Sequence, residues 1–176
     1  YKAKGWENVI CYGMGSTLDD VKNAAAAEMN IVCSASAIKA AEYLKEKFGT
    51  PYEIEYPQSC LPEEIVQKAY NFTDKNVLVI HNQTAADAVR KLITEKSGKC
   101  HCTSATFFMQ KKELLQQSDF FLADESDLCD NVGDNYDVVI ADKTLRRVMK
   151  NFSGEFIDFP HFGLSGRLLQ GESEKI

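Results

Sequence analysis

The pattern of apolar and polar positions in residues 30–57 predicts a strand, a helix and a second strand. Ile31–Cys33 is a short apolar run, and apolar residues then recur every three or four positions. This spacing places them on one face of a helix; they are Ala37, Ala41, Leu44 and Phe48. Gly49 and Pro51 are typical of a helix end, and Tyr52–Tyr56 is extended. In such a β-α-β unit the loop after the first strand lies at the carboxyl end of a parallel strand, where open α/β sheets bind ligands.

Two continuous apolar runs in the second half predict strands that are buried on both faces, Val77–Ile80 and Val138–Ile140. The segment after the first run, residues 85–96, has helical spacing of its apolar positions. Shorter elements are predicted around them, with strands at 100–108, 119–123 and 154–160 and helices at 111–117 and 143–150. The apolar residues of the acidic stretch 124–134 show no clear helical or strand spacing, so we predict irregular structure there.

The first half has two further predicted elements and a boundary. Residues 8–12 are predicted to form a strand that turns through Gly13 and Gly15 into a helix, and residues 62–72 a helix that begins with a proline and two acids. The polar triplet 73–75 separates this half from the next. We therefore predict an α/β chain of two Rossmann-like lobes, residues 1–73 and 74–176, with parallel sheets flanked by helices and a crevice between their strand ends.

Composition limits the classes of partner. The chain has 176 residues, of which 44% are hydrophobic, and a formal net charge of −6. No apolar run approaches the roughly 20 residues of a membrane span, and nucleic-acid binders usually carry basic surfaces, so we expect neither membrane nor nucleic acid as a partner. The six cysteines are dispersed through regular α/β sequence, which favours reduced thiols and a cytoplasmic location. Because the chain begins with Tyr1, we expect it to be a piece of a longer protein.

Several short motifs resemble ligand-binding or catalytic motifs but are better explained as ordinary structural residues. Gly13-Met14-Gly15 lacks the third glycine of a dinucleotide fingerprint, and the following acids would repel phosphate. Cys100-His101-Cys102 has no second cysteine pair at zinc-ribbon spacing, and on a strand the histidine points away from the thiols. The carboxylates at 124, 125 and 127 lack the calcium-loop pattern. Gly163–Gly166 is one residue short of a nucleophile elbow, so a hydrolase is rejected.

Two separated segments, in the same order, resemble the nitrogenase component 1 family. This family includes nitrogenase molybdenum-iron protein chains, their cofactor-assembly scaffolds and dark-operative protochlorophyllide reductase subunits. The first segment is Met29–Val32 with its Cys/Ser-rich loop, the helix containing Tyr43–Phe48, and Gly49–Pro51. The second is a Tyr-Asp-Val-Val-Ile strand, a short helix and a strand that closes in Phe-Pro, followed by Phe162, Gly163, Gly166 and Arg167. The resemblance implies a fragment equivalent to the second and third domains of the family.

The resemblance also implies a site. In the catalytic nitrogenase chain the metal cofactor is anchored by a cysteine after the strand equivalent to residues 29–32 and by a histidine after the final strand. Cys33 and His161 lie near these positions, and Ser34 occupies the place of the family cysteine. We therefore predict Cys33, Ser34 and His161 as cofactor-binding residues, with Cys33 and His161 as metal ligands in one cleft. A small buried thiol and an ordinary loop imidazole are the alternatives.

By this resemblance the chain is part of an oxidoreductase subunit with reductive chemistry at an iron–sulfur-linked site. The implied partners are a homologous component 1 subunit and an ATP-dependent iron–sulfur reductase. The full-length protein would hold an iron–sulfur cluster or a metal cofactor, whereas the isolated chain is expected to bind no cofactor and to be inactive, because no set of thiols is spaced for a cluster. The alternative function is a non-catalytic scaffold or small-ligand-binding module that uses the inter-lobe crevice.

Overall fold

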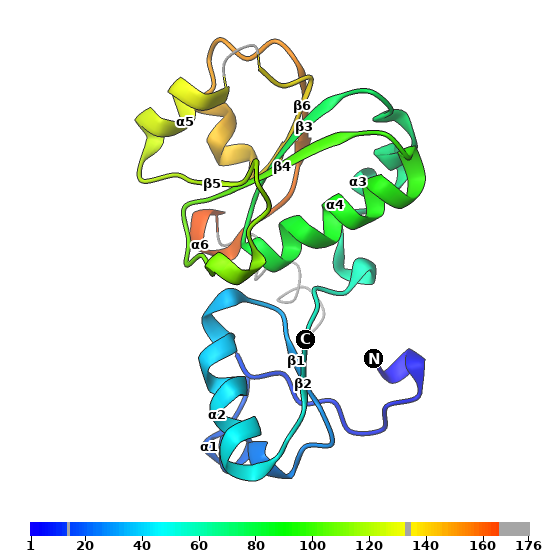
Figure 1. Ribbon diagram of the computed structural model, residues 1–176, viewed down its shortest axis with the longest axis vertical. Coiled ribbons are helices and arrows are strands. Elements are labelled where there is room, and N and C mark those ends of the chain that lie inside the picture. The colour runs from blue at the N-terminus through cyan, green and yellow to red at the C-terminus, as the bar shows by residue number, and fades with distance from the viewer. Residues whose placement is uncertain (14, 133–134, 166–176) are drawn as a thin grey trace. The chain divides into compact units, whose positions relative to one another are not determined.

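The computed structural model describes residues 1–13, 15–132 and 135–165 (Figure 1). By its internal contacts the chain divides into two compact units. The first unit contains residues 1–32 and 37–53, and the second contains residues 33–36 and the described residues from 54 onward. In the described part of the chain, no helix is both long enough and apolar enough to cross a membrane.

The first unit has short elements and a two-stranded sheet of β1 and β2. Its elements are η1 (Lys2–Lys4), α1 (Leu18–Lys22), η2 (Ala24–Ala26), β1 (Asn30–Val32), α2 (Ile38–Phe48) and β2 (Tyr52–Ile54). The short helix η3 (Ala35–Ala37), whose first two residues belong to the second unit, precedes α2. Thr17 begins α1 with a reciprocal capping box to Asp20. Gly49 ends α2 at a φ of 76°, a left-handed conformation that glycine adopts without steric cost. The predicted strand, helix and helix stop of residues 30–51 are confirmed.

The second unit is built around a five-stranded parallel sheet with the order β5-β4-β3-β6-β7. Its strands are β3 (Asn76–Ile80), β4 (His101–Thr106), β5 (Phe120–Phe121), β6 (Val138–Ala141) and β7 (Glu155–Asp158). Its helices are η4 (Gln58–Cys60), α3 (Glu63–Lys68), η5 (Ala69–Asn71), α4 (Gln83–Ser97), η6 (Lys112–Leu114), α5 (Glu125–Val132), η7 (Lys143–Arg147) and α6 (Phe162–Ser165). The central strands β3 and β6 are the two that the continuous apolar runs predict.

Helices cover both faces of this sheet (Figure 1). Val77 and Val79 of β3 belong to a cluster with the buried side chains of α3 and α4, whereas Leu78 and Ile80 point to the other face and join α5 and η7. Successive side chains of a strand alternate between faces, so a central strand between two helical layers must be apolar at every position. This requirement explains why the sequence of β3 shows a continuous run instead of alternation.

Four predicted elements differ from the structure. Residues 8–12 form no strand; Val9 and Ile10 are 42% and 50% exposed and have no neighbouring strand to pair with. The stretch 124–134 was expected to be irregular, but α5 occupies Glu125–Val132, because Asp124 accepts hydrogen bonds from two first-turn N–H groups and Leu128 and Val132 are buried. The predicted helices at 111–117 and 143–150 contain only the short 3₁₀ helices η6 and η7.

The division into compact units differs from the predicted boundary between residues 73 and 74. Residues 54–73 pack with the second unit because Ile65 and Phe72, both fully buried, belong to the same cluster as Val89 of α4. The Ser97 hydroxyl also receives the Phe72 N–H at 3.2 Å. Whether residues 1–73 and 74–176 fold as separate lobes stays a prediction.

Four residues of the sequence motifs lie outside the described residues: Met14, Asp134, Gly166 and Arg167.

Candidate functional site

The strand order creates a topological switch point between β3 and β6. From β3 the chain runs outward through β4 to β5 and then returns to the other side of β3 to form β6 and β7. Loops that leave neighbouring strands in opposite directions open a crevice at the carboxyl edge of the sheet, and open α/β sheets bind ligands there. The residues that follow these strands are His81 and Asn82 after β3, Phe108 after β4, Asp142 after β6 and His161 after β7.

A pocket of about 270 Å³ lies at this edge, and all of its lining residues belong to the second unit. They are Ser34, Ser36, Asn82, Phe108, Met109 and His161. The short segment 33–36 is tied to the edge because the Thr84 hydroxyl, at the start of α4, donates a hydrogen bond to the Cys33 carbonyl oxygen. The two serine hydroxyls lie 2.9 Å apart. Ligand pockets usually measure about 300–1,000 Å³, so this pocket suits a small ligand.

His161 is held in place by ring and backbone contacts. Its ring stacks on that of Phe108, with 3.9 Å between centroids and 14° between planes, and Phe108 is fixed by a hydrogen bond from its N–H to Thr106. The Gly163 N–H donates to Nδ1 of His161 at 3.0 Å. A ring nitrogen that accepts a hydrogen bond carries no proton, so the neutral ring bears its proton on Nε2. Burial lowers the pKa of His161, although the nearby Asp142 opposes the shift.

Asp142 anchors the segment that contains His161. The carboxylate is fully buried and accepts hydrogen bonds from the His161 N–H at 2.9 Å, from the Ser165 hydroxyl, and from the N–H and hydroxyl of Thr144. Burial by itself raises the pKa of Asp142, but these hydrogen bonds, with that from Ser165 the strongest, outweigh it and hold the pKa well below its usual value. Asp142 is therefore ionised at neutral pH and ties the end of β6 to the loop after β7.

A second imidazole lies behind the first. His81 is 3% exposed, stacks on Phe159 at 4.0 Å and contacts His161 edge-on at 4.5 Å. Its Nε2–H donates to the Pro160 carbonyl oxygen at 3.1 Å, and its buried Nδ1 has no partner in the described part of the chain. Burial, and then the neighbouring His161, lower the pKa of His81 to about 4. His81 is therefore a neutral packing group under the pocket at physiological pH.

No protein-family profile matches the sequence, and no curated protein matches it significantly. A search of solved structures finds a similar chain described as nitrogenase Cp1 at pH 6.5, with a TM-score of 0.54 and 14% sequence identity. The alignment covers 96% of the present chain. The fold resembles that of a nitrogenase chain. The present chain spans about half of that chain, since the alignment covers 49% of its length. The structural likeness agrees with the family resemblance that the sequence motifs indicate, and at this identity it concerns the fold alone.

The nitrogenase-like fold brings together two of the three predicted site residues. Ser34 and His161 line the same pocket, and Cys33 stands beside Ser34 with an exposed side chain rather than in a core. Their predicted roles as ligands stay predictions. The sequence alone did not identify Asn82, Phe108 or the anchoring carboxylate of Asp142. Asp142 directly follows β6, and Asn82 and Phe108 stand two residues after β3 and β4. This position near strand ends is the signal that a search of strand ends would have used.

The described hydrogen bonds do not fit His161 as a metal ligand. A metal-bound histidine donates its second ring N–H to a neighbouring acceptor, whereas here Nδ1 accepts from the Gly163 N–H. A metal at Nε2 would then displace the only ring proton. Within the described residues, no group of three or more His, Cys, Asp or Glu side chains is placed to hold a metal ion. None of the six cysteines, all of them described, is in a disulfide.

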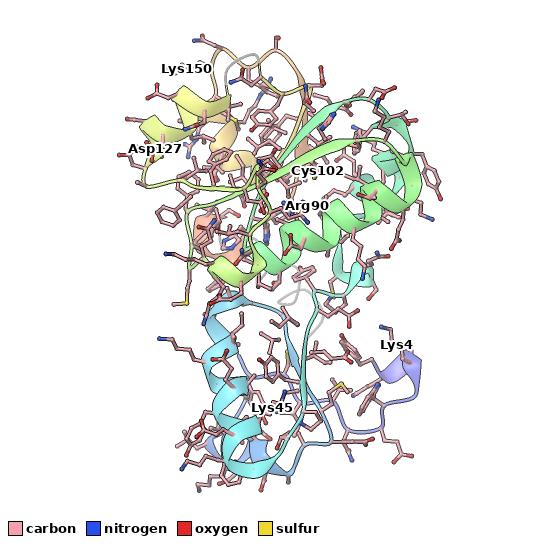
Figure 2. All side chains as sticks on the ribbon, viewed as in Figure 1. Lys4, Lys45, Arg90, Cys102, Asp127 and Lys150 are labelled. Carbon is pink, nitrogen blue, oxygen red and sulfur yellow. The ribbon has the colours of Figure 1, made fainter. Side chains whose placement is uncertain are left out.

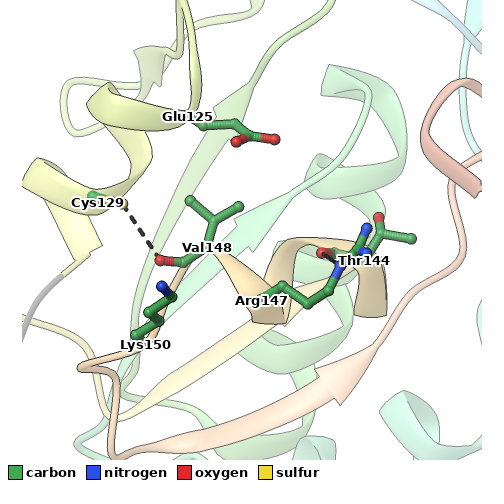
Figure 3. Close-up of a pocket in the computed structure, with 6 residues that line it drawn as sticks. All are labelled: Glu125, Cys129, Thr144, Arg147, Val148 and Lys150. Carbon is green, nitrogen blue, oxygen red and sulfur yellow. Dashed lines mark hydrogen bonds between the residues drawn. The ribbon is translucent and has the colours of Figure 1, made fainter.

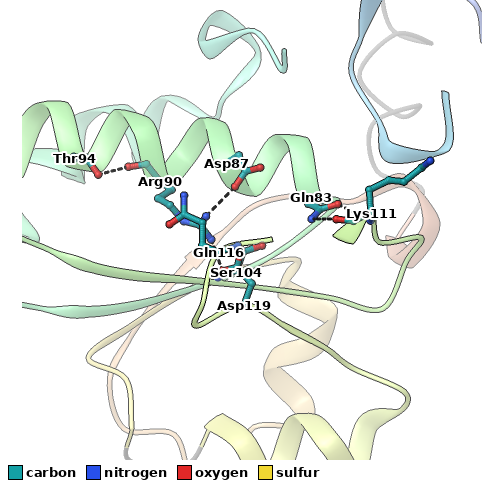
Figure 4. A network of polar contacts seen from close by, with 8 residues as sticks. All are labelled: Gln83, Asp87, Arg90, Thr94, Ser104, Lys111, Gln116 and Asp119. Atoms are coloured by element: carbon teal, nitrogen blue, oxygen red, sulfur yellow. Dashed lines mark hydrogen bonds and ion pairs between the residues drawn. The ribbon is translucent and has the colours of Figure 1, made fainter. Parts of the chain in front are cut away.

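The Cys100-His101-Cys102 motif has a structural place on β4. Burial raises the pKa of the Cys102 thiol to about 12, so this sulfur stays protonated and unreactive at neutral pH. It lies near Arg90 (Figure 2), which belongs to a buried polar network (Figure 4). Arg90 pairs with Asp119 and with Asp87, and Asp119 also accepts the N–H groups of Ser104 and Gln116. This network fixes the connection between β4 and β5.

The loop after β4 is clamped to α4 near the pocket. The Gln83 side chain accepts the Lys111 N–H at 2.9 Å and donates to the Lys111 carbonyl oxygen at 3.0 Å (Figure 4). Gln83 is 1% exposed, and both the oxygen and the NH₂ group of its side-chain amide are hydrogen-bonded. The pair of hydrogen bonds closes the loop that contains Phe108 and Met109, so these two side chains are presented to the pocket by a fixed loop.

A larger hollow of about 600 Å³ lies between α5 and η7 (Figure 3). Its lining residues are Glu125, Cys129, Thr144, Arg147, Val148 and Lys150. The Cys129 thiol donates to the Val148 carbonyl oxygen at 3.4 Å across it. This surface lies beside the helices and not at the switch point of the sheet, and it brings together no three metal-ligating side chains. A substitution in this hollow therefore leaves the pocket at the switch point untouched.

Proposed function

We propose that this chain is part of a nitrogenase component 1-type oxidoreductase subunit, in which the pocket at the carboxyl edge of the five-stranded sheet holds a small ligand near the reductive site. The supporting observation is the combination of a nitrogenase-like fold over 96% of the chain with a pocket that contains Ser34 and His161. Those are the positions that the motif resemblance indicates for cofactor contact. Fold alone does not assign a reaction, so the pocket is the part of the proposal that experiments can address directly.

The full-length protein supplies the rest of the proposed activity. In the proposal the chain corresponds to the second and third domains of the family, in two Rossmann-like lobes. An iron–sulfur cluster or metal cofactor and a homologous component 1 subunit complete the active assembly, and an ATP-dependent iron–sulfur reductase delivers electrons. A cluster would supply the electron storage for reduction. The residues of this chain would bind and orient the ligand, with Asp142 fixing the His161 segment and the Phe108 ring shielding the imidazole from water.

A non-catalytic scaffold or small-ligand-binding module is the second candidate. It is favoured by the protonation state of His161, whose Nδ1 accepts the Gly163 N–H. A ring in this state binds through a hydrogen bond instead of a metal bond. Under this alternative the pocket holds its ligand without any transfer of electrons.

The test uses the full-length protein prepared without oxygen together with its partner subunit and its iron–sulfur reductase. We expect electrons to pass from the reductase to the complex only when ATP is hydrolysed, measured by stopped-flow absorbance of the reductase cluster. His161→Gln should lower substrate turnover at least tenfold while leaving this transfer intact, and Cys129→Ala, in the other hollow, should change neither. Absence of ATP-dependent transfer in a folded complex that contains iron would reject the oxidoreductase and favour the binding module.

A further inference from the structure

The protein backbone determines which ring nitrogen of His161 accepts a hydrogen bond in the pocket. The Gly163 N–H lies 3.0 Å from Nδ1, only two residues along the chain, and belongs to the first turn of α6. First-turn N–H groups have no acceptor inside their own helix, so this donor is available to the ring. The neutral imidazole therefore has its proton on Nε2, and no described residue accepts from Nε2.

The tight packing around Gly163 preserves this arrangement. A Cβ atom added at Gly163 would lie 3.1 Å from the Phe108 ring and 3.3 Å from the His161 ring. Glycine thus lets the backbone approach both stacked rings. The stack with Phe108 and the N–H bond together prevent the ring from flipping to exchange its two nitrogens without breaking a contact.

The other polar groups of the pocket are also suited to donate. Asn82 begins α4 and uses its side-chain oxygen to accept from the Ala85 N–H at 2.9 Å, which leaves its NH₂ group for other partners. The Ser34 and Ser36 hydroxyls hydrogen-bond to each other, so one of the two keeps its proton to donate to a ligand. No carboxylate lines the pocket. A ligand with several acceptor oxygens would therefore match these donors.

We propose that the pocket binds a small oxyanion, a carboxylate or a phosphate, to which His161 donates its Nε2–H, and that His161 is not a metal ligand. This inference rests on the proposed function only for the location of the pocket. The Asn82 amide and one hydroxyl of the serine pair provide the remaining donors, and the volume of about 270 Å³ limits the ligand to a small molecule. Cys33, with its side chain outside the lining of this pocket, takes no part in the binding.

The first experiment measures the position of the ring proton. The chain is labelled with ¹⁵N in its three histidines, and long-range ¹H–¹⁵N correlation spectra are recorded at pH 7.5, with His81→Phe and His101→Gln used for assignment. We expect His161 to show a protonated Nε2 and a bare Nδ1. The opposite tautomer would overturn the proposal.

The second experiment identifies the ligand class on the same sample. Inorganic phosphate and acetate are titrated separately, and at least one should shift the Nε2 signal of His161 with saturation in the millimolar range, at least tenfold more weakly in Asn82→Ala and unchanged in Cys129→Ala. The anion that saturates identifies the source of the oxygens. If neither anion shifts the signal in the folded chain, the proposal is wrong. Because no reductase or ATP is involved, this result is independent of the outcome for electron transfer.

The third experiment asks whether the Gly163 N–H excludes metal. Co²⁺, which broadens the signals of coordinated histidines, should leave His161 sharp in the natural chain and in Gly163→Ala, which keeps the N–H. In Gly163→Pro, which lacks it, Nδ1 can take the proton and Nε2 can coordinate Co²⁺, so broadening should appear. Gly163→Ala is the control for the added Cβ. Broadening of His161 in the natural chain would overturn the proposal whether or not the proline variant folds.

Discussion

In the first unit the buried side chains are mostly small, whereas the second unit buries many large ones. The first unit's buried apolar residues are Ala24, Val32, Ile38 and Ala41, and apolar residues such as Leu18 and Val21 are 80% and 55% exposed. Both extended hydrophobic clusters lie in the second unit, and its fully buried side chains include Phe72, Leu78 and Ile140. Burial of a large apolar side chain contributes roughly 1.5–3 kcal/mol. The difference indicates that the second unit provides the stable scaffold on which the pocket is built.

The largest expected effect is on the folding of fragments. We expect residues 54–176 to unfold cooperatively, residues 1–53 alone to lack a cooperative transition, and residues 74–176 to lose most of the stability of the longer fragment, because Ile65 and Phe72 fill the space beside α4. Urea titration followed by circular dichroism measures all three. If residues 74–176 were as stable as residues 54–176, the predicted lobe boundary at 73 and 74 would be correct.

The next effect concerns two ion pairs, one in each unit. Asp119 is 1% exposed and pairs with Arg90, whereas Asp19 is 82% exposed and pairs with Lys22 at 2.8 Å. Asp119→Ala should lower the free energy of unfolding by about 3–5 kcal/mol, because it leaves the Arg90 charge buried beside one partly exposed partner, Asp87. Asp19→Ala should give no measurable change. Equal effects of the two substitutions in urea denaturation would contradict the proposed contrast between the units.

A matched pair of leucines tests the apolar contacts in the same way. Leu78→Ala should lower the free energy of unfolding by about 2–5 kcal/mol, since it removes a fully buried side chain that packs between the sheet and the helices α5 and η7. Leu18→Ala, at the exposed start of α1, should change it by less than about 0.5 kcal/mol. Thermal unfolding of both variants gives the comparison, and a large loss in Leu18→Ala would mean that the first unit has a core of its own.

The smallest effect appears only in acid. His81 has a pKa of about 4 in the folded chain and an ordinary value of 6.5. Between these values the unfolded chain binds the proton and the folded chain does not, so stability falls as the pH decreases from 6.5 towards 4, by up to about 3 kcal/mol. His81→Phe, which keeps an aromatic ring on Phe159, should remove this part of the slope. His101→Gln, at an exposed position, should keep this slope. An unchanged slope in His81→Phe would show that His81 is not the group that causes the pH dependence.

The sequence predicts the parts of the fold that depend on local pattern. β3 and β6 follow from apolar runs, and the end of α2 follows from Gly49, because burial on two faces and a left-handed turn each leave a signature in adjacent residues. α5 was missed because its start depends on the Asp124 carboxylate and its buried side includes Leu128 and Val132 within an acidic stretch. Residues 8–12 have the composition of a strand, but a strand also needs a partner, which local sequence does not reveal.

The site was predictable only as far as strand ends can be located. Ser34 and His161 were predicted from the family resemblance, in which each follows a strand, and both line one pocket. Asn82 and Phe108 were missed, because their convergence depends on the order of strands in the sheet, which brings β4 beside β3. The tautomer of His161 could not be predicted from the sequence, because it depends on the direction in which the Gly163 N–H points.

The position of β3 at the centre of the sheet also has a consequence for synthesis of the chain on the ribosome. One edge of β3 pairs with β4, but the other pairs Val77 with Val138, which is translated 61 residues later. At roughly 5–20 residues per second, β3 therefore waits about 3–12 s with one row of backbone donors and acceptors unsatisfied. During this interval an apolar strand edge is open to pairing with a neighbouring nascent chain. Translation speed across residues 77–138 thus becomes a determinant of how much protein reaches the native sheet.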